Sequence, residues 1–221
     1  MPESLRETLA FLRQLRVNNS RQWFEDNRAR YDHARGCFQD VVTDLIHQFD
    51  PIDDLSGVTA KECMFRINRD VRFSNDKSPY KSTMSAVLGQ GGRKSTGRTY
   101  YFHIEPDGGS FLAGGLYAPS TDELSKMRQS LAENAKRFKQ VVHAPDFIQY
   151  FGAISGDTLK TAPQGYSKDH PDIDLLRLKQ YIASHALSDD QVLSADLIPH
   201  VLAVFKAMKP LLVYIENVVK A

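Results

Sequence analysis

Apolar residues that recur every three to four positions mark amphipathic helices along much of the chain. The first stripe covers residues 5–15 behind Ser4 and Glu7, which have the spacing of a capping box. A longer helix is predicted over residues 20–49, because its apolar stripe continues until Asp50-Pro51 interrupts the helical backbone. Later stripes predict a helix that begins at Ser120 and helices over 145–151, 172–185 and 195–219.

Between these helices the pattern alternates with a period of two, which is typical of strands that bury one face. Residues 61–73 alternate between a mostly apolar face and a face of charged and amide groups. Asp107-Gly108-Gly109 is a good hairpin sequence, and Gly114-Gly115 predicts a bulge or the close approach of another backbone. The remaining strands are predicted at 83–88, 99–106 and 110–117.

The chain of 221 residues is long enough to bury a sizeable core. It shows no internal repeat, no low-complexity segment and no clear linker. We therefore expect a single α+β domain, in which an antiparallel sheet of about four or more strands packs against long amphipathic helices. The predicted parts are a helical region over 1–50, antiparallel strands with the charged motif over 58–118, and a mainly helical region over 119–221.

The charge of the chain is unevenly distributed. The formal net charge of +1 excludes a globally basic nucleic-acid binder. Residues 64–98, however, contain eight Lys or Arg against two Asp, a local surplus of six positive charges, so the rest of the chain carries a net −5. This asymmetry favours one face of the protein that attracts anions. The alternative interpretation is a charged hairpin that is exposed to solvent and binds nothing.

Cysteine usage and hydropathy predict a soluble cytoplasmic protein without a membrane partner. Cys37 and Cys63 have no metal-type spacing and do not make a secreted disulfide framework, so both are expected to be buried thiols. The N-terminal residues lack the pattern of a signal peptide. No run approaches the roughly 20 apolar residues that span a bilayer.

The richest chemistry lies in residues 64–81, which read M-F-R-I-N-R-D-V-R-F-S-N-D-K-S-P-Y-K. Arg66, Asn68, Asp70 and Arg72 share the polar face of the predicted strand. Guanidinium groups on one face repel each other unless an anion or Asp70 lies between them, and arginine forks bind phosphates well. The motif therefore predicts a pocket for a phosphorylated small molecule.

The residue types of the motif suggest roles in that pocket. Arg66, Arg72, Lys77 and Lys81 would hold the anion, and Asp70 or Asp76 would position a hydroxyl or act as a base. If the protein is an enzyme, phosphoryl or phosphodiester chemistry fits best, because positioning and charge neutralisation do most of that work. The full predicted ligand-binding set is Arg66, Asn68, Arg69, Arg72, Lys77, Tyr80 and Lys81.

No motif identifies a metal, a cofactor or a reaction. The sequence has no nucleophile elbow, no H-E-x-x-H and no clustered His/Cys set. Glu62, Asp70, Asp76 and Glu105 could coordinate Mg²⁺, but their spacing is not diagnostic, so no metal ligand is predicted. The oligomeric state is not fixed either.

Two other functions remain open for the motif. Phe73, Tyr80, Tyr100 and Tyr101 are interleaved with cations and could bind single-stranded nucleic acid by charge and stacking, although the near-zero net charge weighs against this. A non-catalytic protein-interaction surface belongs to the same class. The third interpretation is structural: ion pairs Arg66–Asp70 and Arg69–Asp76 would fasten the hairpin to acidic residues such as Glu25 and Asp26 of the long helix.

Three further features have a functional and a structural interpretation. His103 and Glu105 share one strand face and could be an acid–base pair, but such neighbours are more often polar surface. Trp23 could stack on a ligand, although core packing explains it better. The glycine-rich run 89–92 could approach a phosphate, but it lacks P-loop spacing, and a mobile hairpin tip fits better.

Several segments together resemble a known family. They are residues 65–81, N-N-S-R-Q-W-F at 18–24, Y-Y-F-H-I-E-P at 100–106, G-G-L-Y-A-P at 114–119, and 175–179. The chain resembles, over nearly its whole length, a bacterial and fungal family catalogued as domain of unknown function 2461. The resemblance implies no activity, cofactor or catalytic residue, so the functional hypotheses above rest on residue chemistry.

Overall fold

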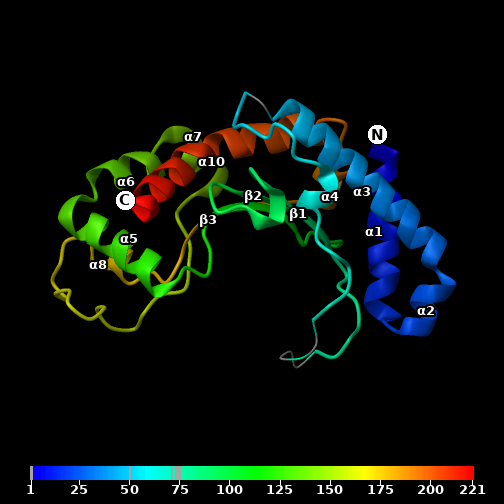
Figure 1. The fold of residues 1–221 in the computed structure, drawn as a ribbon, viewed down its shortest axis with the longest axis horizontal. Coiled ribbons are helices and arrows are strands. Elements are labelled where there is room, and N and C mark those ends of the chain that lie inside the picture. Colours follow the sequence, from blue (N-terminus) through cyan, green and yellow to red (C-terminus); the bar gives the residue numbers. More distant parts are fainter. Residues whose placement is uncertain (1, 50, 71, 73–75) are drawn as a thin grey trace.

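The structure is a computed structural model that describes residues 2–49, 51–70, 72 and 76–221 (Figure 1). It combines helices with a four-stranded antiparallel sheet, which confirms the predicted α+β class. The strands are β1 (Met84–Leu88), β2 (Tyr100–Ile104), β3 (Ser110–Leu116) and β4 (Tyr181–Leu187). The helices are α1 (Pro2–Val17), α2 (Arg21–Asp26), α3 (Arg28–Gln48), α4 (Ala60–Cys63), α5 (Thr121–Asn134), α6 (Lys136–Val142), α7 (Pro145–Phe151), α8 (Ile173–Leu176), α9 (Asp189–Val192) and α10 (Leu197–Lys220), with a short 3-10 helix η1 (Gly92–Lys94).

The sheet has the order β1-β2-β3-β4, and every neighbouring pair is antiparallel. Helices α3 and α10 cover one face of it, and Figure 1 shows them crossing above the strands. On this face Phe38 stacks on Phe102, with ring centroids 5.6 Å apart, and Phe205 contacts Tyr100 at 5.2 Å. Both sheet residues are fully buried, so this layer is the hydrophobic core.

Helix α10 confirms the stripe predicted over 195–219 and continues through Pro210. By length and composition alone it could cross a membrane. Its buried residues, however, include Val201, Phe205 and Met208 in the central core. It is therefore packed like the core helix of a soluble domain.

The helix predicted over 20–49 is divided at Asn27 into α2 and α3. Ser20 caps α2 by accepting the N–H of Trp23, as Ser/Thr caps do. The Asn27 side chain donates to the carbonyl oxygen of Trp23 at 2.9 Å. Asparagine side chains compete with the helical backbone in this way, which explains the break.

The predicted strand over 61–73 is wrong. Thr59 and Glu62 form a complete capping box, so the chain makes the short helix α4 where the alternation suggested a strand. Phe65 then donates its N–H to Ser85 of β1 at 2.9 Å, and the chain leaves the sheet. Met64 forms an isolated bridge to Ala86 of β1, and beyond Phe65 the chain folds back on itself, with an isolated bridge at Asn68–Tyr80. Val71 and Phe73 of the predicted strand lie outside the described residues.

The predicted helix over 172–185 is also wrong, because only its beginning is helical, as α8. Its end belongs to β4, which pairs with β3 over its whole length, from Tyr181–Leu116 to Leu187–Ser110. Gly115 permits this pairing: its φ is +137°, and an added Cβ would lie 2.1 Å from the carbonyl oxygen of Tyr181. The predicted close approach of another backbone is therefore confirmed, and the register shows no bulge there.

Candidate ligand site on the open face of the sheet

The sheet face opposite α3 and α10 is the open face, defined here by Ser85, Tyr101, His103, Phe111, Ala113, Ile182 and Ser184. Alternation places these residues opposite the buried Tyr100, Phe102 and Leu112. In Figure 1 the described residues of the segment 64–81, namely 64–70, 72 and 76–81, which we call the cationic loop, descend on this side of the sheet. The open face and the cationic loop together form the candidate site.

The cationic loop is anchored to the N-terminal helices through Tyr80. This ring is buried and stacks on Phe24 of α2, with centroids 3.9 Å apart. Asn19 holds the Tyr80 backbone through hydrogen bonds of its side chain. Tyr80, predicted as a ligand-binding residue, therefore anchors the cationic loop to the N-terminal helices.

Three cations of the motif lie near one another on this loop. Lys81 is half-buried, and its Nζ lies 5.6 Å from the centroid of the Phe65 ring. Burial lowers the pKa of Lys81, and the positive charges of Arg66 and Arg69 lower it further. Arg69 is paired with Asp76 at 2.9 Å, whereas exposed Arg66 has no hydrogen-bond or ion-pair partner in the described part of the chain.

The two predicted catalytic acids, Asp70 and Asp76, form hydrogen bonds with neighbouring residues of the cationic loop. Asp70 binds Arg72, with a closest N–O distance of 2.7 Å, so the expected Arg66–Asp70 pair is wrong, whereas the Arg69–Asp76 pair is confirmed. Hydrogen bonds from Arg72 hold the pKa of Asp70 below its usual value, and those from Ser78 do the same for Asp76. A lowered pKa makes a carboxylate a weaker base, so neither position favours general-base work.

The other predicted ligand residues are solvent-exposed. Arg72 and Lys77 are exposed near the end of the cationic loop, and exposed Asn68 forms the bridge to Tyr80. Arg66 and Lys81 are therefore the members of the predicted set best placed to offer charge to a ligand on the open face. The expected ion pairs with Glu25 and Asp26 do not occur between described residues: Asp26 accepts a hydrogen bond from Gln22.

A chain of hydrogen bonds crosses the open face. The Tyr101 hydroxyl lies 3.0 Å from Nδ1 of His103, and Nε2 of His103 lies 3.1 Å from the Glu105 carboxylate. Arg16 of α1 binds the same carboxylate at 3.0 Å. The Phe111 ring stacks on the imidazole at 4.5 Å between centroids. We call Tyr101, His103 and Glu105 the relay.

The protonation of the relay follows from its surroundings. Burial lowers the pKa of His103, Glu105 acts in the opposite direction, and nearby Lys81 lowers it again. A neutral imidazole carries one N–H, and the Glu105 carboxylate can only accept, so that proton belongs on Nε2. Nδ1 is then free to accept the hydroxyl proton of Tyr101. Burial raises the pKa of Tyr101, which keeps this phenol protonated at rest.

Beside the relay the open face is hollowed. The hollow has a volume of about 510 Å³ and is mainly apolar, and Tyr101 forms part of its wall. The Phe65 ring lies 6.3 Å from that of Tyr101, which joins the hollow to the cationic loop. Its lining is Phe65, Thr99, Tyr101, Phe111, Ala113, Gly114, Gly115, Tyr117, Ile182 and Ser184.

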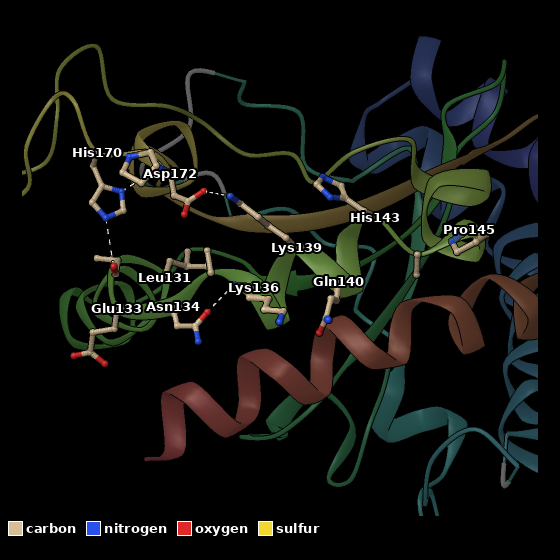
Figure 2. A pocket seen from close by; sticks show the side chains of 14 residues that line it. Leu131, Glu133, Asn134, Lys136, Lys139, Gln140, His143, Pro145, His170 and Asp172 are labelled. Carbon is tan, nitrogen blue, oxygen red and sulfur yellow. Dashed lines mark hydrogen bonds and ion pairs between the residues drawn. The ribbon is translucent and has the colours of Figure 1, made fainter.

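A second groove lies between α5, α6 and residues 170–172 (Figure 2). Two of its charged side chains, Lys139 and Asp172, form an ion pair. His170 reaches the Ala132 carbonyl oxygen at 3.3 Å and accepts the N–H of Asp172 at 3.0 Å. These groups hold the segment against α5, so we assign the groove a structural role. The described residues contain no cluster of three His, Cys, Asp or Glu placed to bind a metal.

Trp23 and the glycine-rich run take structural positions. Trp23 is partly buried and packs on Phe11, with ring centroids 5.8 Å apart, which confirms the core-packing interpretation. Gly92 is buried against α4, and Arg93 donates to the Glu62 carbonyl oxygen at 2.9 Å. The run is therefore packed against α4 rather than arranged around a phosphate.

Comparison with known proteins identifies the family of the chain. Residues 7–214 match the model of a family described as conserved hypothetical protein (DUF2461). Among curated proteins and solved structures, none matches the chain significantly.

Proposed function

The chain belongs to the DUF2461 family of conserved hypothetical proteins, and we propose that it binds a phosphorylated small molecule on the open face of its sheet. The anionic group would lie at Arg66 and Lys81, with Arg69 as the third cation. The organic part would occupy the hollow beside Tyr101. Phosphoryl or phosphodiester chemistry is the reaction class that this arrangement suits best.

The observation that carries the proposal is the unbalanced charge beside the hollow. Arg69 and Arg72 each have a carboxylate partner, as a structural network requires. Arg66 and Lys81 have none among the described residues, and burial and the like charges of Arg66 and Arg69 lower the pKa of Lys81. An anion between these cations would relieve that repulsion and accept the fork of Arg66.

The hollow adds a surface for an apolar or planar group. Aromatic side chains line small-molecule sites because they supply large contact areas and stack on planar groups. Phe65, Tyr101 and Phe111 present such rings next to the cations. This combination favours a phosphorylated organic molecule over free phosphate.

Thermal unfolding with a ligand panel tests the proposal. The panel contains phosphate, pyrophosphate, a sugar phosphate, a nucleoside monophosphate and a single-stranded oligonucleotide, each at equal ionic strength. We expect an organic phosphate to raise the Tm of the wild type, because a ligand that binds only the folded state stabilises it by about 2.7 kcal/mol at a hundred times its Kd.

Single-residue variants make the result specific. Arg66→Ala and Lys81→Ala should each remove most of the Tm shift, whereas the exposed controls Arg21→Ala and Lys136→Ala should keep it. Equal shifts in all four variants, or no shift with any anion, would overturn the proposal. A salt-sensitive shift with the oligonucleotide alone would replace it by the alternative of a non-catalytic interaction module.

We also propose that the protein works in the cytoplasm. Cys37 and Cys63 are both buried and unpaired, which suits a reducing compartment. Fractionation of cells followed by immunodetection checks this, and recovery in an extracytoplasmic fraction would exclude it.

A further inference from the structure

We propose that Tyr101 is a nucleophile toward phosphate esters and that His103 and Glu105 activate it. The proposal rests on the proposed function for its substrate class. It goes beyond anion binding because it assigns a covalent step to a tyrosine that lines the hollow.

The relay has the polarity of a catalytic triad. Glu105 accepts from Nε2 of His103, and the opposite ring nitrogen faces the Tyr101 hydroxyl at 3.0 Å. In such an arrangement the carboxylate orients the imidazole, and the imidazole removes the proton of the nucleophile as the new bond forms. A phenol that stays protonated at rest needs a neighbouring base of this kind.

The surroundings of the relay hold its geometry. Arg16 fixes Glu105 from α1, and Phe111 stacks flat on the imidazole. The charged or titratable groups that face His103 are Glu105, Tyr101 and Lys81. Burial, and to a smaller extent the charge of Lys81, lower the pKa of His103 and so favour the neutral imidazole that can accept a proton.

The chemical step balances without a co-reactant other than water. The Tyr101 oxygen attacks phosphorus, and a new O–P bond forms while the bond from phosphorus to the ester oxygen breaks. The phenol proton moves to Nδ1 of His103, and the ester oxygen, which departs on the opposite side of phosphorus, takes a proton from solvent water. Water then attacks the phosphotyrosyl group from that opposite side and releases a proton to the solvent, while His103 returns its proton to the Tyr101 oxygen. Arg66 and Lys81 would neutralise the phosphoryl oxygens throughout.

Reaction with a neutral aryl sulfonyl fluoride, benzenesulfonyl fluoride, tests the relay without using the anion site. The Tyr101 oxygen would form a bond to sulfur, fluoride would leave, and the proton would pass to His103. Peptide mass spectrometry of the labelled protein compares Tyr101 with Tyr117, which is 78% exposed. We expect Tyr101 to react about tenfold faster or more, because general-base assistance contributes at least that much.

Variants separate activation from simple packing. His103→Ala should slow labelling of Tyr101 about tenfold or more, and added imidazole should restore much of the rate, which a structural role would not allow. Glu105→Gln should slow it less, and the exposed control His143→Ala should leave it unchanged. If His103→Ala fails to fold, Glu105→Gln and His103→Gln carry the test. Labelling of Tyr101 no faster than that of Tyr117, or insensitive to these variants, would refute the activation.

An anionic reagent then distinguishes failure of the relay from failure of the proposed function. With 4-(fluorosulfonyl)benzoate, the cations should accelerate labelling of Tyr101, and Arg66→Ala should remove this acceleration. The rate with benzenesulfonyl fluoride is measured in the same protein as the reference, so the ratio of the two rates reports the anion site and the neutral rate reports the relay. Fast labelling by the neutral reagent without any preference for the anionic one supports the relay and counts against the anion site.

Discussion

The side chain of Asn19 binds both polar groups of the Tyr80 backbone: its Oδ1 accepts the N–H at 3.1 Å, and its Nδ2 donates to the carbonyl oxygen at 2.9 Å. This pair joins the corner between α1 and α2 to the end of the cationic loop. The stacked rings of Phe24 and Tyr80 seal the same junction. The position of Arg66 and Lys81 over the sheet therefore depends on residues about sixty positions earlier in the sequence.

Replacing Asn19 by alanine should weaken this junction. The half-buried Tyr80 backbone groups would lose their hydrogen bonds to Asn19, with only a 3.5 Å contact from Arg69 left to the carbonyl oxygen, and we expect the free energy of unfolding to fall by about 1–3 kcal/mol. Urea denaturation measures the change. Asn18→Ala is the matched control, because the Asn18 side chain donates only to the Gln14 carbonyl oxygen in the last turn of α1, and its loss should change stability by less than about 0.5 kcal/mol.

Tyr80 should prove important for its ring rather than for its hydroxyl. Tyr80→Phe keeps the stack on Phe24 and should change stability by less than about 1 kcal/mol, whereas Tyr80→Ala should lower it by about 3–5 kcal/mol. Binding of the panel ligands by Tyr80→Phe should equal that of the wild type. Loss of binding without loss of stability would instead assign the Tyr80 hydroxyl to the ligand, as the sequence motif suggested.

Gly115 should tolerate no side chain. Gly115→Ala places a Cβ 2.1 Å from the Tyr181 carbonyl oxygen at a φ of +137°, and we expect a loss of about 3 kcal/mol or more. Gly36→Ala is the control: Gly36 lies within α3 with nothing within 4 Å of the added Cβ, so it should gain about 0.5–1 kcal/mol. Chemical denaturation of both variants measures the contrast. Similar stabilities would contradict the packing of β4 on β3.

The relay should make stability depend on pH. Burial lowers the pKa of His103 from its ordinary value of 6.5, so the unfolded state takes up a proton at a higher pH than the folded state does. The stabilisation is complete above pH 6.5 and is lost as the pH falls toward the lowered folded pKa. We expect the free energy of unfolding to decline with acidification over this window and the decline to be smaller in His103→Gln. A parallel decline in both proteins would show that His103 does not contribute.

Local signals predicted the elements that depend on local sequence. The capping box at Ser120 and the apolar stripes predicted α5 and α10, and the hairpin sequence after β2 predicted its pairing with β3. The strand β4 was mistaken for a helix because its identity depends on β3, its distant partner in the sequence. Residues 61–65 show the opposite error: the alternation predicted a strand, but the capping box of Thr59 and Glu62 starts the helix α4 there.

The same distinction applies to the site. The sequence identified Arg66 and Lys81 and placed Tyr101, His103 and Glu105 on one face, because both inferences follow from the motif and from strand alternation. It could not bring Lys81 next to His103, since that proximity arises where the loop folds back against the sheet. The sequence also suggested an ion pair between Arg66 and Asp70, whereas Asp70 binds Arg72, which lies nearer to it along the chain.

The late position of β4 has a consequence during synthesis on the ribosome. Until residue 187 has emerged, the outer edge of β3 presents unpaired backbone N–H and C=O groups to other nascent chains. Exposed edges of this kind are templates for intermolecular strand pairing. A message truncated between codons 117 and 180 would therefore give a product with an open sheet edge, and such products should aggregate or require chaperones and proteases.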